Sequence, residues 1–310
     1  MITLRGLTKR FGATVAVDAL TVDVAPGRVT GFLGPNGAGK STTMRMILGL
    51  DRPTAGQALV GGRAYRELRR PLREVGALLD ARAIHPARSG RAHLLAMARS
   101  NGIPAGRVDE VLDTVGLDAH AAGKPGRTLS LGMGQRLGIA GALLGDPPVL
   151  MFDEPVNGLD PDGVRWVRQL TRTLADEGRT VFVSSHLMSE MQLTADQLVV
   201  IGRGRLLADA PVDEVIAGSG IAVRVRSPQR EGLATLAAHL TAGGATVEAA
   251  GPDELIVTGT TADRVGDLAH ELGVRLHELS PHGASLEQAF MELTADSVEY
   301  AGGPTGGGTR

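Results

Sequence analysis

The residues best suited to chemistry form a glycine-rich segment, GPNGAGKST, at positions 34–42. Glycines at this spacing let backbone N–H groups turn inward around phosphate oxygens, and the helix that follows adds its dipole. The segment predicts a phosphate cradle made by Gly34, Pro35, Asn36, Gly37, Ala38, Gly39, Lys40, Ser41 and Thr42. Lys40 is expected to reach the β- and γ-phosphates, and Ser41 to offer its hydroxyl to Mg²⁺. The alternative is a chance glycine-rich turn.

Two acidic residues follow an apolar run in the sequence VLMFDEP, at positions 149–155. A phosphate cradle alone binds a nucleotide, whereas hydrolysis also needs an acid that orients a metal and a group that positions water. Asp153 is the expected Mg²⁺ ligand, and Glu154 is suited to polarise the attacking water. Alone, two acids after a strand also suit a plain helix start, but together with the loop they favour nucleotide hydrolysis.

The elements that must position these groups alternate in type, which is typical of an α/β domain over residues 1–218. Residues 30–33 form a short apolar run that Gly34 stops, and residues from Ser41 onward have helical spacing. Runs at 148–152 and 180–184 predict buried central strands. Residues 88–116 read as helical on both sides of a break at 102–104, which predicts a helical subdomain.

The pattern restarts after residue 218. Strands are expected at 221–225, 246–248, 255–257 and 274–279, and helices are expected around 233–240 and 265–272. The order strand, helix, strand, strand, helix, strand predicts a small ferredoxin-like α+β domain at 219–295. It ends in an amphipathic stretch at 286–293, and the Gly-rich residues 296–310 predict a flexible tail.

Composition excludes several classes of protein. At 310 residues the chain is long enough for two domains. Lys and Arg number 32 against 34 Asp and Glu, a net charge of −2, which argues against general binding of nucleic acid. With no cysteine there are no disulfides, thiolate metal sites or Cys nucleophile. The start lacks the pattern of a secretory signal, and no apolar run approaches the ~20 residues that span a bilayer.

Over roughly residues 1–210 the chain resembles the ATP-binding subunit of an ATP-binding cassette (ABC) transporter. That family carries a signature ahead of the acidic pair, and LSLGMGQR occupies the place at 129–136. The resemblance implies that Ser130 and Gly132 meet a γ-phosphate; a helix cap is the alternative for Ser130. Leu129 and Gln135 also match. Leu131 and Met133 depart from the pattern, because the family usually has Gly and Gln there.

Further marks of the family follow in order. Asn157 and Asp160, in NGLDP, resemble the D-loop that links two active sites across a dimer. His186 resembles the switch histidine that contacts the γ-phosphate. Phe11 resembles the aromatic residue on which adenine stacks, with an ordinary core residue as its alternative. Asp80 stands where the family carries a Gln that senses Mg²⁺ and the membrane partner.

The resemblance implies a P-loop NTPase ABC cassette with a RecA-like core, an antiparallel β subdomain and a helical subdomain. It implies binding of ATP and Mg²⁺, ATP hydrolysis, and a dimer, expected to be a homodimer, in which the signature of one copy completes the phosphate site of the other. No specific nucleic-acid partner is expected. Since the chain has no spanning segment, its substrate must cross through a separate polytopic permease, with the cassette at the cytoplasmic face of the membrane.

The signature variant, Asp80 and the SLEQAFMELT ending resemble bacterial drug, antibiotic or lantibiotic exporters, so export is favoured over import. Two alternatives are a soluble cassette ATPase acting on DNA or the ribosome and a nucleotide-sensing regulator without hydrolysis. The C-terminal domain is expected to be a packing or dimer-stabilising appendage, with small-molecule regulation second. A basic cluster within residues 63–73 is expected to be a solvated helix face, or else a contact for a partner or anionic lipid.

Overall fold

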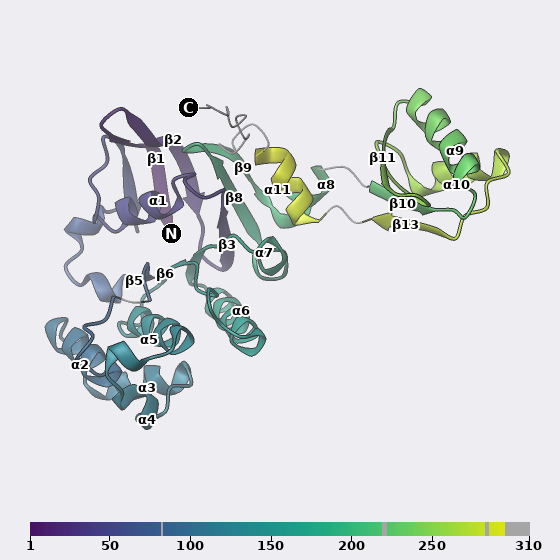
Figure 1. Cartoon of the computed structure of the whole chain (residues 1–310). Coiled ribbons are helices and arrows are strands. Elements are labelled where there is room, and N and C mark those ends of the chain that lie inside the picture. The colour runs from purple at the N-terminus through teal and green to yellow at the C-terminus, as the bar shows by residue number, and fades with distance from the viewer. Residues whose placement is uncertain (82, 219–221, 283–284, 295–310) are drawn as a thin grey trace, which may run out of the picture. The chain divides into compact units, whose positions relative to one another are not determined.

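The computed structural model describes residues 1–81, 83–218, 222–282 and 285–294. The described residues divide into two compact units, residues 1–211 with 293–294 and residues 212–292 (Figure 1). The second unit begins with α8 (Val212–Gly218), so the division falls before this helix, whereas the sequence places it after residue 218. The tail expected at 296–310 lies outside the described residues.

The first unit is built around a six-stranded sheet with the order β5-β6-β7-β3-β8-β9. All neighbours are parallel except β9, which is antiparallel to β8. Buried residues fill β6 and β7 and most of β3, which confirms the strands predicted there. The strands are β3 (Arg28–Leu33), β5 (Val75–Leu78), β6 (Val149–Asp153), β7 (Thr180–Ser184), β8 (Gln197–Gly202) and β9 (Arg205–Pro211).

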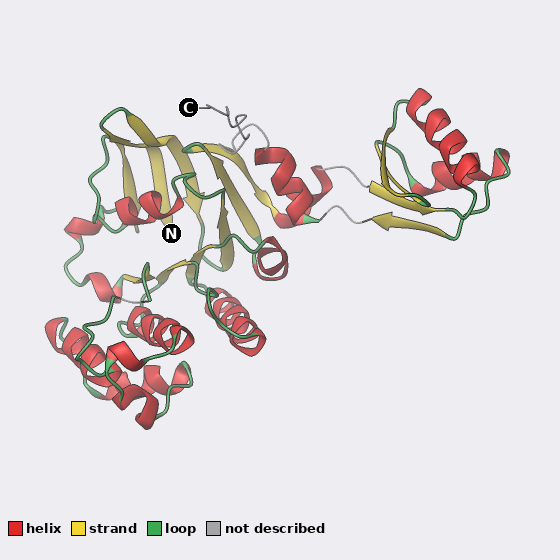
Figure 2. Ribbon diagram, viewed as in Figure 1, coloured by secondary structure: helices red, strands yellow, loops and turns green. Residues whose placement is uncertain are grey.

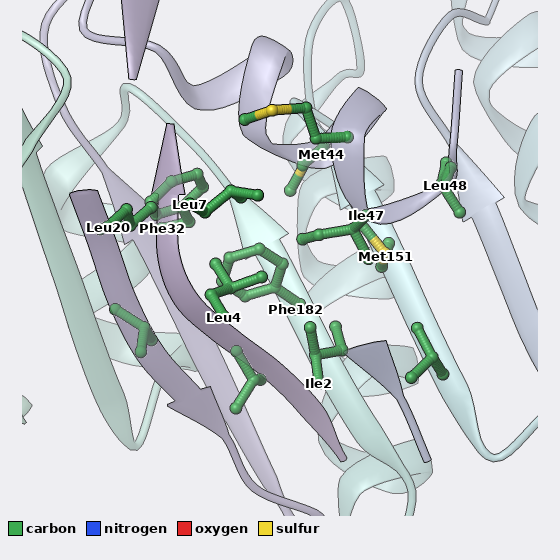
Figure 3. Close-up of a cluster of buried hydrophobic side chains, with 14 of the residues drawn as sticks. Ile2, Leu4, Leu7, Leu20, Phe32, Met44, Ile47, Leu48, Met151 and Phe182 are labelled. Atoms are coloured by element: carbon green, nitrogen blue, oxygen red, sulfur yellow. The ribbon is translucent and has the colours of Figure 1, made fainter. Parts of the chain in front are cut away.

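A three-stranded antiparallel sheet, with the order β2-β1-β4, packs on the first sheet through a shared apolar core. Its strands are β1 (Ile2–Phe11), β2 (Thr14–Val24) and β4 (Ala55–Val60). In Figure 3, Ile2 and Leu4 of β1 lie close to Phe182 of the larger sheet. The rings of Phe32 and Phe182 are stacked with centroids 4.9 Å apart. Helix α1 (Lys40–Ile47) adds Met44 and so anchors the loop before it in this core.

The middle of the chain forms a group of helices beside the larger sheet (Figure 2). It comprises α2 (Gly90–Ser100), α3 (Gly106–Thr114), α4 (Ala119–Gly123) and α5 (Leu131–Leu143), with a short 3₁₀ turn at Gly126–Thr128. The gap between α2 and α3 contains the break predicted at 102–104. Two further helices connect strands of the core: α6 (Pro161–Asp176), which packs against β3 and β7, and α7 (Met188–Thr194), which packs against α6. Among the described residues, no helix is long and apolar enough to cross a membrane.

The basic cluster between β4 and β5 is not a helix face, contrary to one of the two expectations. Its members, Arg63, Arg66, Arg69, Arg70 and Arg73, are spread over two short 3₁₀ turns, Tyr65–Glu67 and Pro71–Arg73, and the bends around them. Arg63 pairs with Glu74 at 2.5 Å, and Arg73 Nη2 donates to the carbonyl of Gly102 at 3.1 Å. These two guanidinium groups therefore have structural partners within the chain.

The second unit contains the predicted order strand, helix, strand, strand, helix, strand. These elements are β10 (Ala222–Arg226), α9 (Arg230–Ala242), β11 (Thr246–Gly251), β12 (Glu254–Thr258), α10 (Ala262–Glu271) and β13 (Glu278–His282). Helix α11 (Leu286–Thr294) follows, and its last two residues belong to the first unit. Its four-stranded sheet has the order β11-β12-β10-β13, with every pair antiparallel. Val223, Leu236 and Val265 belong to an apolar core of this unit, separate from that of the first.

The last strand of this sheet begins later than the sequence predicts, at Glu278 instead of residue 274. Of the preceding residues, His277 donates its N–H to the Arg226 carbonyl of β10 at 2.8 Å, whereas the backbone of Arg275 is bonded to side chains. Gln229 Oε1 accepts from the Arg275 N–H at 2.8 Å, and Ser227 Oγ donates to the Arg275 carbonyl at 2.9 Å. Val274 donates its own N–H to the Ala269 carbonyl at 2.8 Å and is buried in the core without belonging to a strand.

Candidate functional site

The glycine-rich segment forms the turn between β3, which ends at Leu33, and α1, which begins at Lys40. Gly37 and Gly39 have φ values of +82° and +105°, a region that favours glycine. At Gly34 an added Cβ would lie 2.5 Å from the Ile201 carbonyl, and at Gly39 it would overlap the Ala16 carbonyl. Side chains are therefore excluded where the backbone must turn, as the sequence predicts for a phosphate cradle.

Lys40 is folded into this loop. Its Nζ donates to the carbonyl of Gly34 at 2.5 Å and to that of Pro35 at 3.3 Å, and the residue is only 8% exposed. Burial lowers the pKa of Lys40, while the negative charges of Glu154 and Asp153 act in the opposite direction. The structure thus holds one cation within the loop and within the field of both acids.

The loop and the two acids line one pocket of about 340 Å³. Residues 35–42 form its main wall, and Ala16, Leu79, Asp153 and Glu154 complete it. The structure therefore brings together the predicted phosphate cradle and the predicted acidic pair, which are more than a hundred positions apart in the sequence. Gly34 lies outside this lining, at the base of the loop.

The two acids occupy the end of β6 beside the end of β7. Asp153 is in register with Ser184, and Ser184 Oγ donates to Asp153 Oδ1. The same hydroxyl accepts from the Glu154 N–H at 3.0 Å. Glu154 has φ = +51°, which costs free energy for a residue with a side chain and is common at functional positions. Ser184 therefore holds both acids in place from the neighbouring strand.

His186 lies against Glu154. Its Nδ1 is 2.7 Å from Glu154 Oε2, and its side chain is 52% exposed. His186 is the second residue after β7, and Glu154 is the first residue after β6. Because β6 and β7 are parallel neighbours, the two side chains lie next to each other. The sequence prediction placed both residues at one site, and their geometry allows an imidazole to share a proton with the carboxylate or to orient it.

Ser130 lies in a different place. It is the N-cap of α5, where its Oγ accepts from the Met133 N–H at 3.2 Å. In the single chain Ser130 therefore acts as a helix cap, the alternative that the sequence left open for it. Ser130 lines a second pocket of about 450 Å³ together with Ala81, Pro86, Arg127, Leu131 and Gly134, among others. This pocket shares no residue with the phosphate pocket. Gly132 lies in the first turn of α5.

Helix α5 is fastened to the core by the two residues after its first turn. Gln135, which is 5% exposed, donates from Nε2 to the carbonyls of Glu154 at 3.2 Å and Asn157 at 3.4 Å. The guanidinium of Arg136 lies 4.3 Å from the centre of the Trp166 ring on α6. Hydrogen bonds from Gln135 therefore connect the first half of α5 to the segment that begins at Glu154.

The remaining predicted site residues lie around this arrangement. Asp160 is the N-cap of α6, and its Oδ1 accepts from the Gly163 N–H at 2.8 Å. Phe11 is the last residue of β1 and is 51% exposed, with Lys9 Nζ 4.8 Å from its ring centre, so it is not an ordinary core residue. Asp80 follows β5 and is exposed; its neighbour Leu79 lines the phosphate pocket, whereas Asp80 does not.

One residue with a clear role in this geometry is missed by the sequence analysis. From the sequence, Ser184 is only the last residue of a buried strand. Its contacts with Asp153 and Glu154 depend on the register between β6 and β7, which a pattern of hydrophobic residues does not specify. The only available signal is a polar residue at the carboxyl end of an apolar run, where ligand-binding residues of parallel sheets gather.

Comparisons with known proteins agree with this geometry. The family described as "ABC transporter" matches residues 17–157, and a domain of unknown function, DUF8746, matches residues 221–287. The bacitracin transport ATP-binding protein BcrA of Bacillus licheniformis is 43% identical over 212 residues, 67% of this chain and 69% of BcrA. The daunorubicin resistance ATP-binding protein DrrA3 of Streptomyces coeruleorubidus is 34% identical over 309 residues, which cover 95% of this chain and 96% of DrrA3.

Among solved structures, the dimeric post-hydrolysis state of the ATP-binding cassette MJ0796, bound to ADP and Pi, has a TM-score of 0.62. The match covers 68% of this chain and 99% of that one at 23% identity, which establishes a shared fold. The fold of the first unit is that of an ABC ATPase cassette, with its antiparallel sheet beside the larger one. The chain belongs to the ABC transporter family and is an ATP-binding subunit and ATPase of that family.

Proposed function

We propose that this chain is the ATP-driven motor of a bacterial drug or antibiotic exporter whose membrane permease is a separate polypeptide. The observation that carries the proposal is the single pocket in which a glycine-rich loop and a buried lysine face Asp153 and Glu154. The rest of the proposal assigns a role to each group around this pocket.

The loop would bind the phosphates of ATP. Backbone N–H groups of residues 36–42 suit the oxygens, and Lys40 would exchange its carbonyl partners for the β- and γ-phosphates. Lys40 is already inside the loop, so its ammonium needs to move only within the pocket. Phe11 is proposed to stack on adenine, because its exposed ring offers a face at the end of β1.

Mg²⁺ fits the donor set of this pocket. Ser41 and Asp153 are oxygen donors lining the same space, and Mg²⁺ commonly takes one or two protein ligands beside substrate phosphates and water. Among the described residues no group of three or more His, Cys, Asp or Glu could hold a metal by itself, which suits such shared binding. Bound Mg²⁺ would neutralise charge on the β- and γ-phosphate oxygens. Asp80 is proposed as a further contact to the metal or its water.

Hydrolysis would proceed through Glu154 and His186. Glu154 is proposed to accept a hydrogen bond from the attacking water and so increase its nucleophilicity. His186 contacts the same carboxylate through Nδ1, so it can orient Glu154 while its second ring nitrogen, Nε2, would contact the γ-phosphate. Ser184 fixes the start of this segment, since it binds the Glu154 N–H.

A second copy of the chain is proposed to complete the site. Ser130 and the phosphate pocket share no lining within one chain, which supports a signature turn supplied by a partner. ATP would then be held from both sides, and hydrolysis would remove the contacts that favour the closed dimer. Asp160 and Asn157 would lie in the loop that links the two sites. MJ0796, which shares the fold, is described as a dimer with ADP and Pi.

Export of an antibiotic or drug is supported by the relatives, which are described as bacitracin transport and daunorubicin resistance proteins. Closure and opening of the dimer would rotate the attached permease between two states. The cassette would then work at the cytoplasmic face of the membrane. We propose the second unit as an accessory domain that packs on the assembly, with small-molecule regulation as its other possible role.

Release of phosphate tests this function. The wild-type chain is expected to hydrolyse ATP with Mg²⁺, and Lys40→Ala is expected to abolish turnover. Glu154→Gln is expected to bind ATP and to elute as a dimer with little turnover. A wild type without turnover, even with its co-purified permease, would contradict the motor and favour a nucleotide-sensing regulator. Recovery of the chain with a solute receptor instead of an exporter permease would overturn the direction of transport.

A further inference from the structure

The turn that begins α5 packs against the loop after Glu154 through Leu131. Gly158, in that loop, has φ = +73°. A Cβ added to Gly158 would overlap Leu131 Cδ2 and would lie 2.7 Å from its Cγ and 3.4 Å from its Cβ. The leucine side chain therefore covers the α-carbon of Gly158 and occupies the place that a side chain at 158 would need.

The reverse contact is present as well. A Cβ added to Gly132, the neighbour of Leu131, would lie 3.3 Å from Cδ2 of Leu159, the neighbour of Gly158. Each segment thus contributes a leucine and a glycine, and each leucine covers the glycine of the other segment. We call this reciprocal contact, formed by Leu131, Gly132, Gly158 and Leu159, the leucine–glycine pair.

The pair lies between the groups proposed to act on ATP. Ser130 precedes it on one side, and Glu154 lies four positions before Gly158 on the other. Gln135 strengthens the same junction, since its Nε2 donates to the carbonyls of Glu154 and Asn157. Leu131 itself is 41% exposed and lines no part of the phosphate pocket, so burial of apolar surface alone does not account for its place.

We infer that Leu131 is a positioning residue: through the leucine–glycine pair it fixes the signature turn at Ser130 against the loop that follows Glu154. The two segments then move as one body when the site closes. The inference rests on the proposed function and deepens it, because it assigns a role to the residue that departs from the usual signature. It also requires glycine at position 158, since a Cβ there collides with Leu131.

The test is a rescue. Three variants are made in the full-length chain: Gly158→Ala, Leu131→Ala and the double variant. For each, kcat and KM for ATP are measured in steady-state assays, and the free energy of unfolding is measured separately in urea. Leu131→Ala removes the Cγ and Cδ atoms, which leaves a Cβ–Cβ distance of 3.4 Å to the new alanine, an ordinary contact. The double variant therefore relieves the collision that Gly158→Ala introduces.

Gly158→Ala is expected to lower kcat by about 100-fold, the size of effect that follows a misplacement of about 1 Å, with little change in KM. Leu131→Ala is expected to give a smaller decrease in kcat. The kcat of the double variant is expected to be roughly tenfold higher than that of Gly158→Ala, because effects of residues in contact are not additive.

Two control variants separate this role from general effects. Gly178→Ala carries a similar strain at φ = +86° with no atom within 4 Å of the new Cβ, and Leu193→Ala removes another leucine that is 60% exposed. Both are expected to keep the wild-type kcat. The inference is overturned if wild type hydrolyses ATP and either the double variant is no faster than Gly158→Ala or Leu131→Ala alone matches wild type. Absence of wild-type turnover instead contradicts the proposed function.

Discussion

The Nδ1 atom of His186 lies 2.7 Å from Oε2 of Glu154, although the two residues are 32 positions apart. The contact exists because β6 and β7 are parallel neighbours in register, with Asp153 beside Ser184, so the segments after both strands leave the sheet side by side. Asp153, Glu154 and His186 therefore lie at one edge, the carboxyl end of the sheet, where open α/β folds place their ligands.

Removal of the His186 ring should slow hydrolysis and leave ATP binding nearly intact. His186→Ala frees Glu154 Oε2 from its partner, and we expect kcat to fall by about 10², the lower end for a general acid–base or orienting group. Steady-state phosphate release checks this, with KM as the separate measure of binding. His120→Ala, on the exposed surface of α4, is the matched control. An unchanged kcat in His186→Ala would remove the histidine from the mechanism.

Loss of the Ser184 hydroxyl should lower the stability of the chain. Its Oγ donates to Asp153 and accepts from the Glu154 N–H, and the residue is fully buried. We expect Ser184→Ala to lower the free energy of unfolding by about 1.5–3 kcal/mol, the range for a hydrogen bond to a charged group. Urea unfolding measures this. Ser100→Ala, an exposed serine in α2, should stay near wild type, and equal stability of the two variants would contradict the argument.

The helical subdomain should lose stability in mild acid through His93 on α2. Burial lowers the pKa of His93, and the positive charge of Arg88 lowers it further. The folded chain therefore keeps the ring neutral where the unfolded chain protonates it, from about pH 6.5 downward. This contribution to stability is complete above pH 6.5 and is lost as the pH falls from there through the lower folded-state pKa.

The free energy of unfolding, followed from pH 8 to pH 5, checks this expectation. His93→Gln replaces the titrating ring with a neutral polar side chain, so its curve should fall less steeply between pH 6.5 and pH 5 than that of wild type. Parallel curves for the two proteins would assign the acid sensitivity to other groups.

A substitution in the core of the second unit should destabilise that unit without affecting the first. Leu236 on α9 is fully buried in the core of that unit and absent from the core of the first. Leu236→Ala is expected to cost about 2–5 kcal/mol through lost contacts and the cavity that remains. A two-step melting curve should show one step shifted down and the other unchanged, while affinity for ATP stays at the wild-type value. A weakened affinity would show that the nucleotide site depends on the second unit.

The sequence predicts most of the site because its parts are local. The glycine spacing in residues 34–39 encodes the turn directly, since backbone with positive φ and close carbonyl neighbours tolerates little else. The apolar runs at β3, β6 and β7 are buried on both faces, so a continuous run marks each strand. The two acids then follow from their position after one of these strands, whereas His186 is identified by its resemblance to the switch histidine of the family.

What the sequence does not predict depends on contacts between distant segments. Leu131 looks like a departure from the signature until Gly158 is seen beneath it, and nothing in either segment indicates the other. Ser184 is similar, because its partners depend on strand register. The late start of β13 has the same cause, since side chains of Ser227 and Gln229, nearly fifty positions earlier, bind the backbone of Arg275.

The stacking of Arg136 on Trp166 gives this protein a built-in optical probe. The chain contains a single tryptophan, so all indole emission comes from a ring in contact with the helix that begins at Ser130. A guanidinium at 4.3 Å that withdraws from the ring changes its electrostatic surroundings and therefore its emission. Stopped-flow fluorescence of the unlabelled chain can thus report any change in the Arg136–Trp166 contact between α5 and α6 during nucleotide binding and release.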